Sequence, residues 1–171
     1  MSLTSDFFTL FNLPVAFEID VQSLTARYRE LQRTVHPDKF ADAPERDRRL
    51  ALQQAAHINE AFNTLKAPLS RGRYLLQLKG FDTQEQQNTA MDPAFLMQQM
   101  DLREQLAAVK EIDALNDFLT ELEQQTQILN NQLKQQFIDE TYEQAGDTVR
   151  KLQFFHKLNE EAMQLEEDLL D

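Results

Sequence analysis

The side chains best suited to chemistry stand together at His36-Pro37-Asp38, where an imidazole and a carboxylate flank a proline. Such a pair can serve as general acid and base, but only with a substrate pocket and a third group that orients the imidazole. Pro37 restricts His36 and fixes its own φ angle, so we expect a helix to end there and a short, stiff loop to follow. A short surface loop offers neither requirement. The tripeptide therefore predicts recognition by a partner, and not an enzyme.

Apolar residues recur at three- and four-residue steps on both sides of this loop, as they do on one face of a helix. The upstream set is Val21, Leu24, Tyr28, Leu31 and Val35, and the downstream set is Ala51, Ala55, Ile58, Phe62 and Leu65. The loop is therefore predicted to join two helices that pack against each other.

Basic residues accompany the loop on the preceding helix. Residues 21–39 carry Arg27, Arg29, Arg33 and Lys39 against Glu30 and Asp38, so four positive minus two negative groups give a local charge of +2. Helical spacing puts Arg29 and Arg33 on a face turned away from the apolar stripe, with Arg27 on the other flank. This patch can steer the loop toward an acidic partner surface. The alternative is that the arginines are only solvated.

Composition predicts a folded protein of one domain or two small ones. Of 171 residues 42% are hydrophobic, 12 are Phe and none is Cys, which excludes disulfides and thiolate metal sites. No apolar run approaches the roughly 18 residues of a membrane-spanning helix, and the N-terminus lacks a signal-peptide pattern. We expect a cytoplasmic protein without a membrane partner, cofactor or metal site. The chain also has no Gly-rich phosphate loop, so ATP binding by that route is not expected.

The net charge of −12 is divided unevenly along the chain. Residues 1–75 hold ten Lys/Arg and nine Asp/Glu, giving +1, whereas residues 76–171 hold seven and twenty, giving −13. The division suggests two modules with different electrostatic partners, although an acidic surface can also serve solubility alone. The acidic part would be repelled by phosphate, so no nucleic acid partner is expected.

The pattern predicts an all-α chain, since no window shows the two-residue alternation of strands. Helices are expected at residues 6–12, 20–36, 44–66, 68–79, 93–110, 113–140 and 142–170. Asp20 is a candidate N-cap, Gly80 a helix stop and Pro93 a first-turn residue. The polar residues 80–92 form the predicted linker, and the three long helices after it are expected to make an antiparallel bundle.

The helix predicted at 93–110 carries two apolar sectors. Its bundle-facing sector, within about 60° on a helical projection, contains Phe95, Leu102, Leu106 and Val109. Leu96, Met97 and Met100 lie about 100–200° away from Phe95, and Asp101 and Glu104 border them. A second apolar patch rimmed by acid can hold a partner, and methionine adapts well to irregular surfaces. The alternative is that the linker or the preceding helix covers the patch.

The other two helices of the bundle are expected to supply its core. The inward residues predicted for 113–140 are Leu115, Leu119, Leu122, Leu129, Leu133 and Phe137, and those predicted for 142–170 are Phe155, Leu158, Ala162, Leu165 and Leu169. His57 and His156 have no second ligand at metal spacing and are expected to be ordinary helical surface residues.

Residues 6–74 resemble a J-domain, the module by which co-chaperones engage DnaK-type chaperone ATPases. The residues that carry the resemblance are Phe11-Asn12-Leu13, Tyr28, Leu31, His36-Pro37-Asp38-Lys39, the block Ile58 to Leu65, Pro68, Arg71 and Tyr74. The same tripeptide between two amphipathic helices, followed by that second block, is a far more specific signal than the tripeptide alone.

The whole chain resembles the HscB family, the J-type co-chaperones of bacterial iron–sulfur cluster assembly. The family features are His36-Pro37-Asp38-Lys39-Phe40, the segment Leu69 to Leu76, the segment Asp147 to Leu152, and an acidic helical bundle after the J-domain. The resemblance implies a J-domain at 1–79, a linker at 80–92 and a scaffold-binding three-helix bundle at 93–171.

The resemblance also implies two protein partners. The J-domain would stimulate the DnaK-type chaperone HscA, and the bundle would hold and deliver the iron–sulfur cluster scaffold IscU. The expected chaperone-binding residues are His36, Pro37, Asp38, Lys39, Arg27, Arg29 and Arg33. The expected scaffold-binding residues are Leu96, Met97, Met100, Asp101 and Glu104, with Phe154 as their neighbour on the last helix. A structural adaptor without chaperone activity, or a co-chaperone for another client, are the alternatives.

Overall fold

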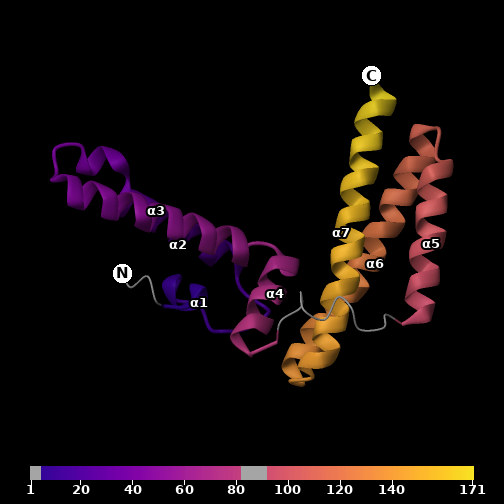
Figure 1. Cartoon of the computed structure of the whole chain (residues 1–171), viewed down its shortest axis with the longest axis horizontal. Coiled ribbons are helices and arrows are strands. Elements are labelled where there is room, and N and C mark those ends of the chain that lie inside the picture. The colour runs from indigo at the N-terminus through magenta and orange to yellow at the C-terminus, as the bar shows by residue number, and fades with distance from the viewer. Residues whose placement is uncertain (1–4, 82–91) are drawn as a thin grey trace. The chain divides into compact units, whose positions relative to one another are not determined.

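A computed structural model describes residues 5–81 and 92–171, and every described element is a helix (Figure 1). The predicted all-α class is confirmed. The chain divides into two compact units, Met1–Leu75 and Leu76–Asp171. Most of the predicted linker, 80–92, lies outside the described residues. None of the described helices is long and apolar enough to cross a membrane.

The first unit is built around an antiparallel pair of helices. The helices are α1 (Phe7–Leu10), α2 (Val21–Val35), the short 3₁₀ helix η1 (Pro37–Phe40), α3 (Glu45–Leu65) and α4 (Pro68–Leu78), which continues into the second unit. The largest fully buried side chains of this unit are Phe8, Leu24, Ile58 and Leu65. They come from α1, α2 and α3, so α1 packs against the hairpin that α2 and α3 form.

Side-chain caps explain where two of these helices begin. The Asp20 carboxylate accepts hydrogen bonds from the backbone N–H groups of Gln22 and Ser23 at 3.0 and 3.2 Å and from the Ser23 hydroxyl at 2.8 Å. These bonds, the Ser23 hydroxyl first, hold the pKa of Asp20 below its usual value. Asp6 caps α1 in the same way through the N–H of Thr9 at 2.9 Å. The predicted N-cap at Asp20 is confirmed.

A buried arginine joins α4 to the rest of the first unit. The Arg71 side chain donates through Nε to the carbonyl of Phe17 at 2.5 Å and through Nη1 to the carbonyl of Leu65 at 2.8 Å. The residue is only 6% exposed, and burial lowers the pKa of Arg71 against the opposing charge of Glu18. One guanidinium therefore supplies hydrogen bonds to a backbone carbonyl at the end of α3 and to another in the segment before α2.

The second unit contains three long helices, α5 (Pro93–Ala108), α6 (Ile112–Ile138) and α7 (Tyr142–Leu170). In Figure 1, α6 and α7 run antiparallel, and α5 lies beside them in the same direction as α7. The bundle core is a stripe of apolar side chains, namely Leu115, Phe118, Leu122, Leu129 and Leu133 on α6 and Ala145, Val149, Leu152, Phe155, Leu158 and Ala162 on α7.

Four residues of the predicted bundle core need correction. Leu119 and Phe137 are half-buried, and Phe118 takes the core position instead. On α7 the core stripe is buried only as far as Ala162. Leu165 is half-buried and Leu169 is 36% exposed, although both were predicted to point inward.

Candidate functional site

The tripeptide His36-Pro37-Asp38 lies where α2 ends and η1 begins. His36 has an extended backbone (φ −59°, ψ 133°), the conformation that a following proline favours. Its Nδ1 accepts a hydrogen bond from the backbone N–H of Asp38 at 3.2 Å and therefore caps η1. In the neutral ring the proton then sits on Nε2, so the outward nitrogen of His36 is a donor.

The two ionisable groups of the tripeptide face solvent. The His36 side chain is 57% exposed and the Asp38 side chain 92%, and their closest approach, from Nδ1 to Oδ2, is 3.6 Å. An exposed pair at this distance contributes little to stability. It also lacks the dry pocket that acid–base catalysis uses. The prediction of an exposed loop is confirmed, with the difference that the loop is a 3₁₀ turn.

A groove of about 860 Å³ runs beside the tripeptide along the α2–α3 hairpin. We call it the hairpin groove. It is lined by Arg29, Gln32, Arg33 and Val35 of α2, by residues His36 to Lys39, and by Ala55 and Asn59 of α3. The structure thus brings together six of the seven residues predicted for chaperone binding.

A hydrogen-bonded chain holds one wall of the hairpin groove. The Tyr28 hydroxyl donates to Oδ1 of Asn59 at 2.6 Å, and Nε2 of Gln32 donates to the Tyr28 hydroxyl at 2.6 Å. The Tyr28 ring stacks on Phe62 with 4.0 Å between centroids. Because Gln32 and Asn59 line the groove, they are site residues that sequence reasoning missed. The four-residue step from Tyr28 to Gln32 was the available signal.

Arg27 is the one predicted residue that lies apart. Its Nη1 pairs with Oε2 of Glu30 at 3.1 Å, and it lines a different groove, of about 490 Å³, together with Thr9 of α1 and Gln54 of α3. The helical step from Arg27 to Arg29 is about 200°, which turns the two side chains to opposite faces of the hairpin. Arg27 thus lies on the other flank of α2, as the sequence indicated, and its contact with the chaperone stays a prediction.

The outer face of α5 exposes three large apolar side chains. Leu96 is 44% exposed, Met97 67% and Met100 64%. Phe95 and Leu102, at 5% and 3%, bury the opposite side of the helix. The two-sector prediction for this helix is confirmed. The acidic neighbours Asp101 and Glu104 are exposed as well.

Phe154 of α7 contacts α5 through Phe95 and through Arg103, which lies within about 20° of Leu96 on a helical projection. Its ring meets Phe95 edge to face at 5.7 Å, and the Arg103 guanidinium lies 5.4 Å above it. Nη1 of Arg103 also reaches Oε2 of Glu161 on α7 at 3.1 Å. Arg103 therefore ties the exposed face of α5 to α7, a role that sequence reasoning missed because it depends on how the two helices pack.

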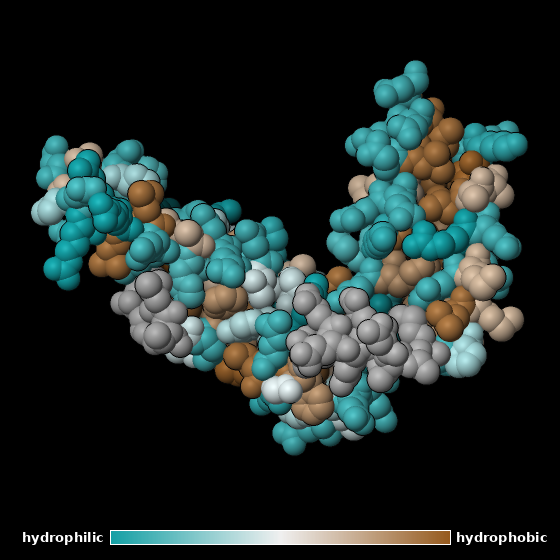
Figure 2. Space-filling model, viewed as in Figure 1, coloured by the Kyte–Doolittle hydropathy of each residue, from teal (hydrophilic) through white to brown (hydrophobic). Residues whose placement is uncertain are grey.

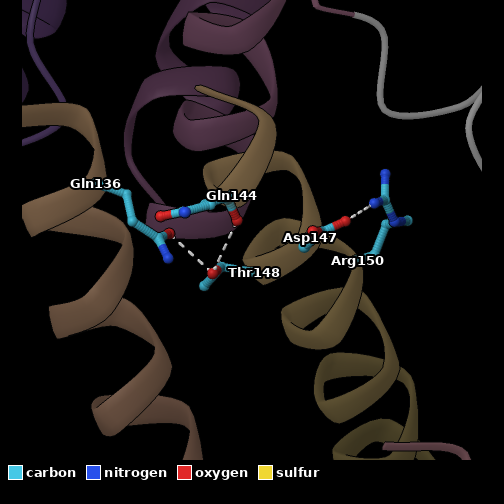
Figure 3. Close-up of polar contacts among 5 residues, drawn as sticks. All are labelled: Gln136, Gln144, Asp147, Thr148 and Arg150. Atoms are coloured by element: carbon cyan, nitrogen blue, oxygen red, sulfur yellow. Dashed lines mark hydrogen bonds and ion pairs between the residues drawn. The ribbon is translucent and has the colours of Figure 1, made fainter. Parts of the chain in front are cut away.

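The segment Asp147 to Leu152 gives α7 two polar contacts (Figure 3). The buried Thr148 hydroxyl donates to Oε1 of Gln136 on α6 at 2.8 Å and lies 3.2 Å from the carbonyl oxygen of Gln144. Arg150 pairs with Asp147, and its burial lowers the pKa of Arg150. The Thr148–Gln136 bond links α7 to α6, and the remaining contacts lie within α7, so this part of the family pattern has a structural role.

The two remaining histidines differ from each other. His156 is exposed and pairs with Glu160 at 3.2 Å, as expected of a surface residue. His57 is half-buried, its ring meets Phe7 edge to face at 5.6 Å, and its Nε2 is buried without a hydrogen-bond partner. The surface prediction for His57 is wrong, because α1 covers this turn of α3. Within residues 5–81 and 92–171, no three His, Asp or Glu side chains form a metal site.

Comparison with known proteins agrees with this architecture. Residues 91–163 match the family described as the HSCB C-terminal oligomerisation domain. The structure resembles the chaperone HscB from Vibrio cholerae with 42% sequence identity and a TM-score of 0.86, covering 96% of this chain and 99% of that one.

Two eukaryotic structures are similar as well. Human co-chaperone HscB shares 29% identity with a TM-score of 0.92, over 96% of this chain and 83% of the human one. The Jac1 co-chaperone from Saccharomyces cerevisiae shares 26% identity with a TM-score of 0.78, over 94% of this chain and 96% of Jac1. With a 42% identical relative matched over nearly its full length, the chain belongs to the HscB family, the J-type co-chaperones of iron–sulfur cluster assembly.

Proposed function

We propose that this protein stimulates the ATPase of the DnaK-type chaperone HscA and delivers the scaffold IscU to it, without catalysing a reaction itself and within the cytoplasm. Residues 1–79 would act as the J-domain and residues 93–171 as the scaffold carrier, joined by the linker 80–92. The observation that carries the proposal is that each unit has an exposed recognition surface of its own, the hairpin groove in the first and the outer face of α5 in the second.

The hairpin groove suits an acidic protein partner. Arg29, Arg33 and Lys39 line it together with the single carboxylate of Asp38, so its rim is net positive in a chain of charge −12. Pro37 and the Tyr28–Asn59 hydrogen bond restrict the groove before any partner binds, which reduces the entropy lost on association.

The outer face of α5 suits an apolar partner surface. The exposed apolar side chains of α5 lie together on one sector of the helix, at Leu96, Met97 and Met100. Apolar side chains that are exposed without a binding role are usually scattered singly over a protein surface. The acidic rim of Asp101 and Glu104 would orient a partner that carries positive charge. We assign Phe154 to the same surface because Arg103, which shares the sector of Leu96, lies over its ring.

The first test is the steady-state ATPase rate of HscA with this protein, with and without IscU. His36→Gln should abolish stimulation while circular dichroism stays unchanged and the melting temperature changes little, since the side chain is 57% exposed and its bond to the Asp38 N–H caps only the short η1. His156→Gln, at another exposed histidine, is the control and should stimulate normally. A folded His36→Gln protein with full stimulation would contradict the proposed role of the loop.

The second test separates the two activities. A triple variant with Leu96→Ala, Met97→Ala and Met100→Ala should lose IscU binding in calorimetry and keep the stimulation of HscA measured without IscU. A control triple, Ile128→Ala, Ile138→Ala and Met163→Ala, removes equally exposed apolar side chains from α6 and α7 and should bind IscU normally. If both triples bind IscU equally well, the α5 face is not the scaffold site.

The description of the matching family as an oligomerisation domain favours a second candidate for the α5 face, contact with another copy of the chain. Sedimentation equilibrium of the wild type and the α5 triple variant distinguishes the two. A concentration-dependent dimer that the triple variant loses would support self-association. A monomer in both samples, with IscU binding lost only in the variant, supports the scaffold role.

A further inference from the structure

The apolar stripe by which α7 contributes to the bundle core continues beyond Ala162, the last buried residue of the helix. Phe155, Leu158 and Ala162 are buried at alternating steps of three and four residues. The next members of the same stripe, Leu165 and Leu169, are half-buried and 36% exposed. The helix therefore presents core-type side chains, on its core-facing side, over its last two turns.

The end of α5 supplies matching residues. Nη1 of Arg103 on α5 lies 3.1 Å from Glu161 on α7, and the two helices run in the same direction (Figure 1). One turn beyond this pair, Leu106 comes level with Leu165. Val109, the C-cap that follows the last helical residue of α5, comes three residues after Leu106, and Leu169 comes four residues after Leu165. Leu106 and Val109 are half-buried too. We call these four residues the α5–α7 seam.

Figure 2 shows hydrophobic surface gathered between α5 and α7 toward the end of α7. This surface differs from the outer face of α5, because Leu106 and Val109 lie in the sector of Phe95 and Leu102, whereas Met97 and Met100 lie about 140–200° from Phe95. The seam and the outer face are therefore two separate apolar surfaces of one bundle.

Carboxylates flank the α7 side of the seam. On a helical projection Glu161, Glu166 and Asp168 border the Leu165–Leu169 stripe, and residues 160–171 contain no basic side chain. Arg103 and Lys110 border the α5 side, and Arg103 is already paired with Glu161. The α7 side of the seam is therefore negative and has no cation of its own.

The direction of α7 adds to this negative charge. Its last turn contains no basic residue, and it ends among Glu166, Glu167 and Asp168. Negative side chains at a helix C-terminus oppose the helix dipole and destabilise the helix end. A cationic partner placed there would remove the repulsion, so the charge pattern independently favours a basic ligand.

We propose that the α5–α7 seam is a docking surface for a basic amphipathic helix of a partner protein. Such a helix would pack on the seam through apolar residues spaced three and four apart. Lysine or arginine on the flanks of that helix would meet Glu166 and Asp168 of α7. A second copy of this chain is a poorer occupant, because it would bring the carboxylates of one α7 end against those of another.

The test uses a fluorescent Leu/Lys amphipathic peptide about five turns long and the full chain at physiological salt. Leu169→Asp and Leu170→Asp each add one negative charge at neighbouring positions, but Leu170 lies off the stripe and is 70% exposed. If the peptide binds at the seam, Leu169→Asp should lower its affinity about tenfold, whereas Leu170→Asp should leave the affinity unchanged or raise it slightly. Binding through charge alone would give the two variants the same small increase in affinity.

Methyl NMR locates the peptide independently. Shifts at Leu106 and Leu165 that exceed those at Met97 and Met100 support the seam, and the reverse order overturns it. Val109→Asp, on the α5 side, should reproduce the Leu169→Asp effect. Absence of binding to the wild type, equal responses of Leu169→Asp and Leu170→Asp, or a wild-type dimer that Leu169→Asp dissociates would each refute the proposal.

Discussion

The hairpin groove and the outer face of α5 are both exposed, but different forces hold their side chains in place. In the groove, backbone geometry and polar bonds position the residues, through Pro37, the Asp38 N–H bonded to His36, and the Tyr28–Asn59 pair. On α5, the helix itself sets the directions of Met97 and Met100, and Phe95 and Leu102 anchor the opposite side.

This difference separates two ways of building a recognition surface. Polar bonds fix a short segment in one conformation but depend on several distant residues at once. An amphipathic helix needs only periodicity and a few buried anchors. We therefore expect the first unit to be sensitive to loss of polar contacts, and the second to loss of buried apolar volume.

The largest effect on the first unit is expected at Arg71. Arg71→Met keeps much of the volume but leaves the carbonyls of Phe17 and Leu65 without their donor, and should lower the free energy of unfolding of the first unit by about 3 kcal/mol. Hydrogen exchange at the amides of Ile58 and Leu158 reports the two units separately. Only Ile58 should lose protection.

Arg48→Met, at an exposed arginine of α3, is the control for Arg71→Met and should leave both amides protected. If Arg71→Met and Arg48→Met behave alike, polar contacts do not dominate the first unit and the proposed contrast between the units fails.

A matched pair on α5 examines the second unit. Leu102→Ala empties a core position and should cost about 2–5 kcal/mol, whereas Met100→Ala, at a 64% exposed side chain, should cost less than about 0.5 kcal/mol. Urea unfolding followed by circular dichroism measures both. A large loss at Met100 would mean that the outer face is part of the core, and would remove the distinction between anchor and surface residues.

Charge reversal at Arg29 and Arg33 tests whether the basic rim of the hairpin groove speeds association with the chaperone. Arg29→Glu with Arg33→Glu should slow association with HscA about tenfold at low salt and flatten its salt dependence, because rim charges act mainly on encounter. Arg46→Glu with Arg48→Glu makes the same change in net charge on an exposed part of α3 outside the groove. Stopped-flow rates that are equal for the two double variants would show that only the total charge matters.

A smaller effect on the first unit is expected at the start of α2. Asp20→Ala removes acceptors for Gln22 and Ser23 and should lower the melting temperature of the first unit by a few degrees at neutral pH. Since the folded pKa of Asp20 is depressed, its stabilisation is full above the unfolded pKa and disappears as pH falls through the folded value. The wild-type and variant melting curves should therefore converge in strong acid. A difference that persists there would point to lost packing.

Local signals in the sequence were enough to predict most helix boundaries. Asp20 caps α2 as expected, and Gly80, at φ +86°, ends the α4 turn through the bond from the Phe81 N–H to the Leu76 carbonyl at 2.8 Å. Helix α1 is shorter than predicted because Asn12 takes a left-handed backbone (φ 55°). Helix caps and breaks of this kind depend only on residues close in sequence, so they can be predicted from the sequence alone.

Contacts between helices were harder to predict. Phe118 and Leu119 both fit a stripe of three- and four-residue steps, and only the position of α7 decides that Phe118 is the buried one. The surroundings of Arg27, Asn59 and Arg103 were hard to predict for the same reason. Arg27 faces α1, and the side chains that Asn59 and Arg103 contact lie on other helices. The outer face of α5 was predictable because it requires a single helix and no partner element.

The bonds of Arg71 also order events during synthesis. Its acceptors, the carbonyls of Phe17 and Leu65, precede it by 54 and 6 residues, so both are made before their shared donor. While the chain grows from its N-terminus, α2 and α3 can pair, but the end of α3 keeps an unbonded carbonyl until residue 71 has left the ribosome. A nascent chain that stalls before α4 would therefore expose the hairpin without the contact that completes it.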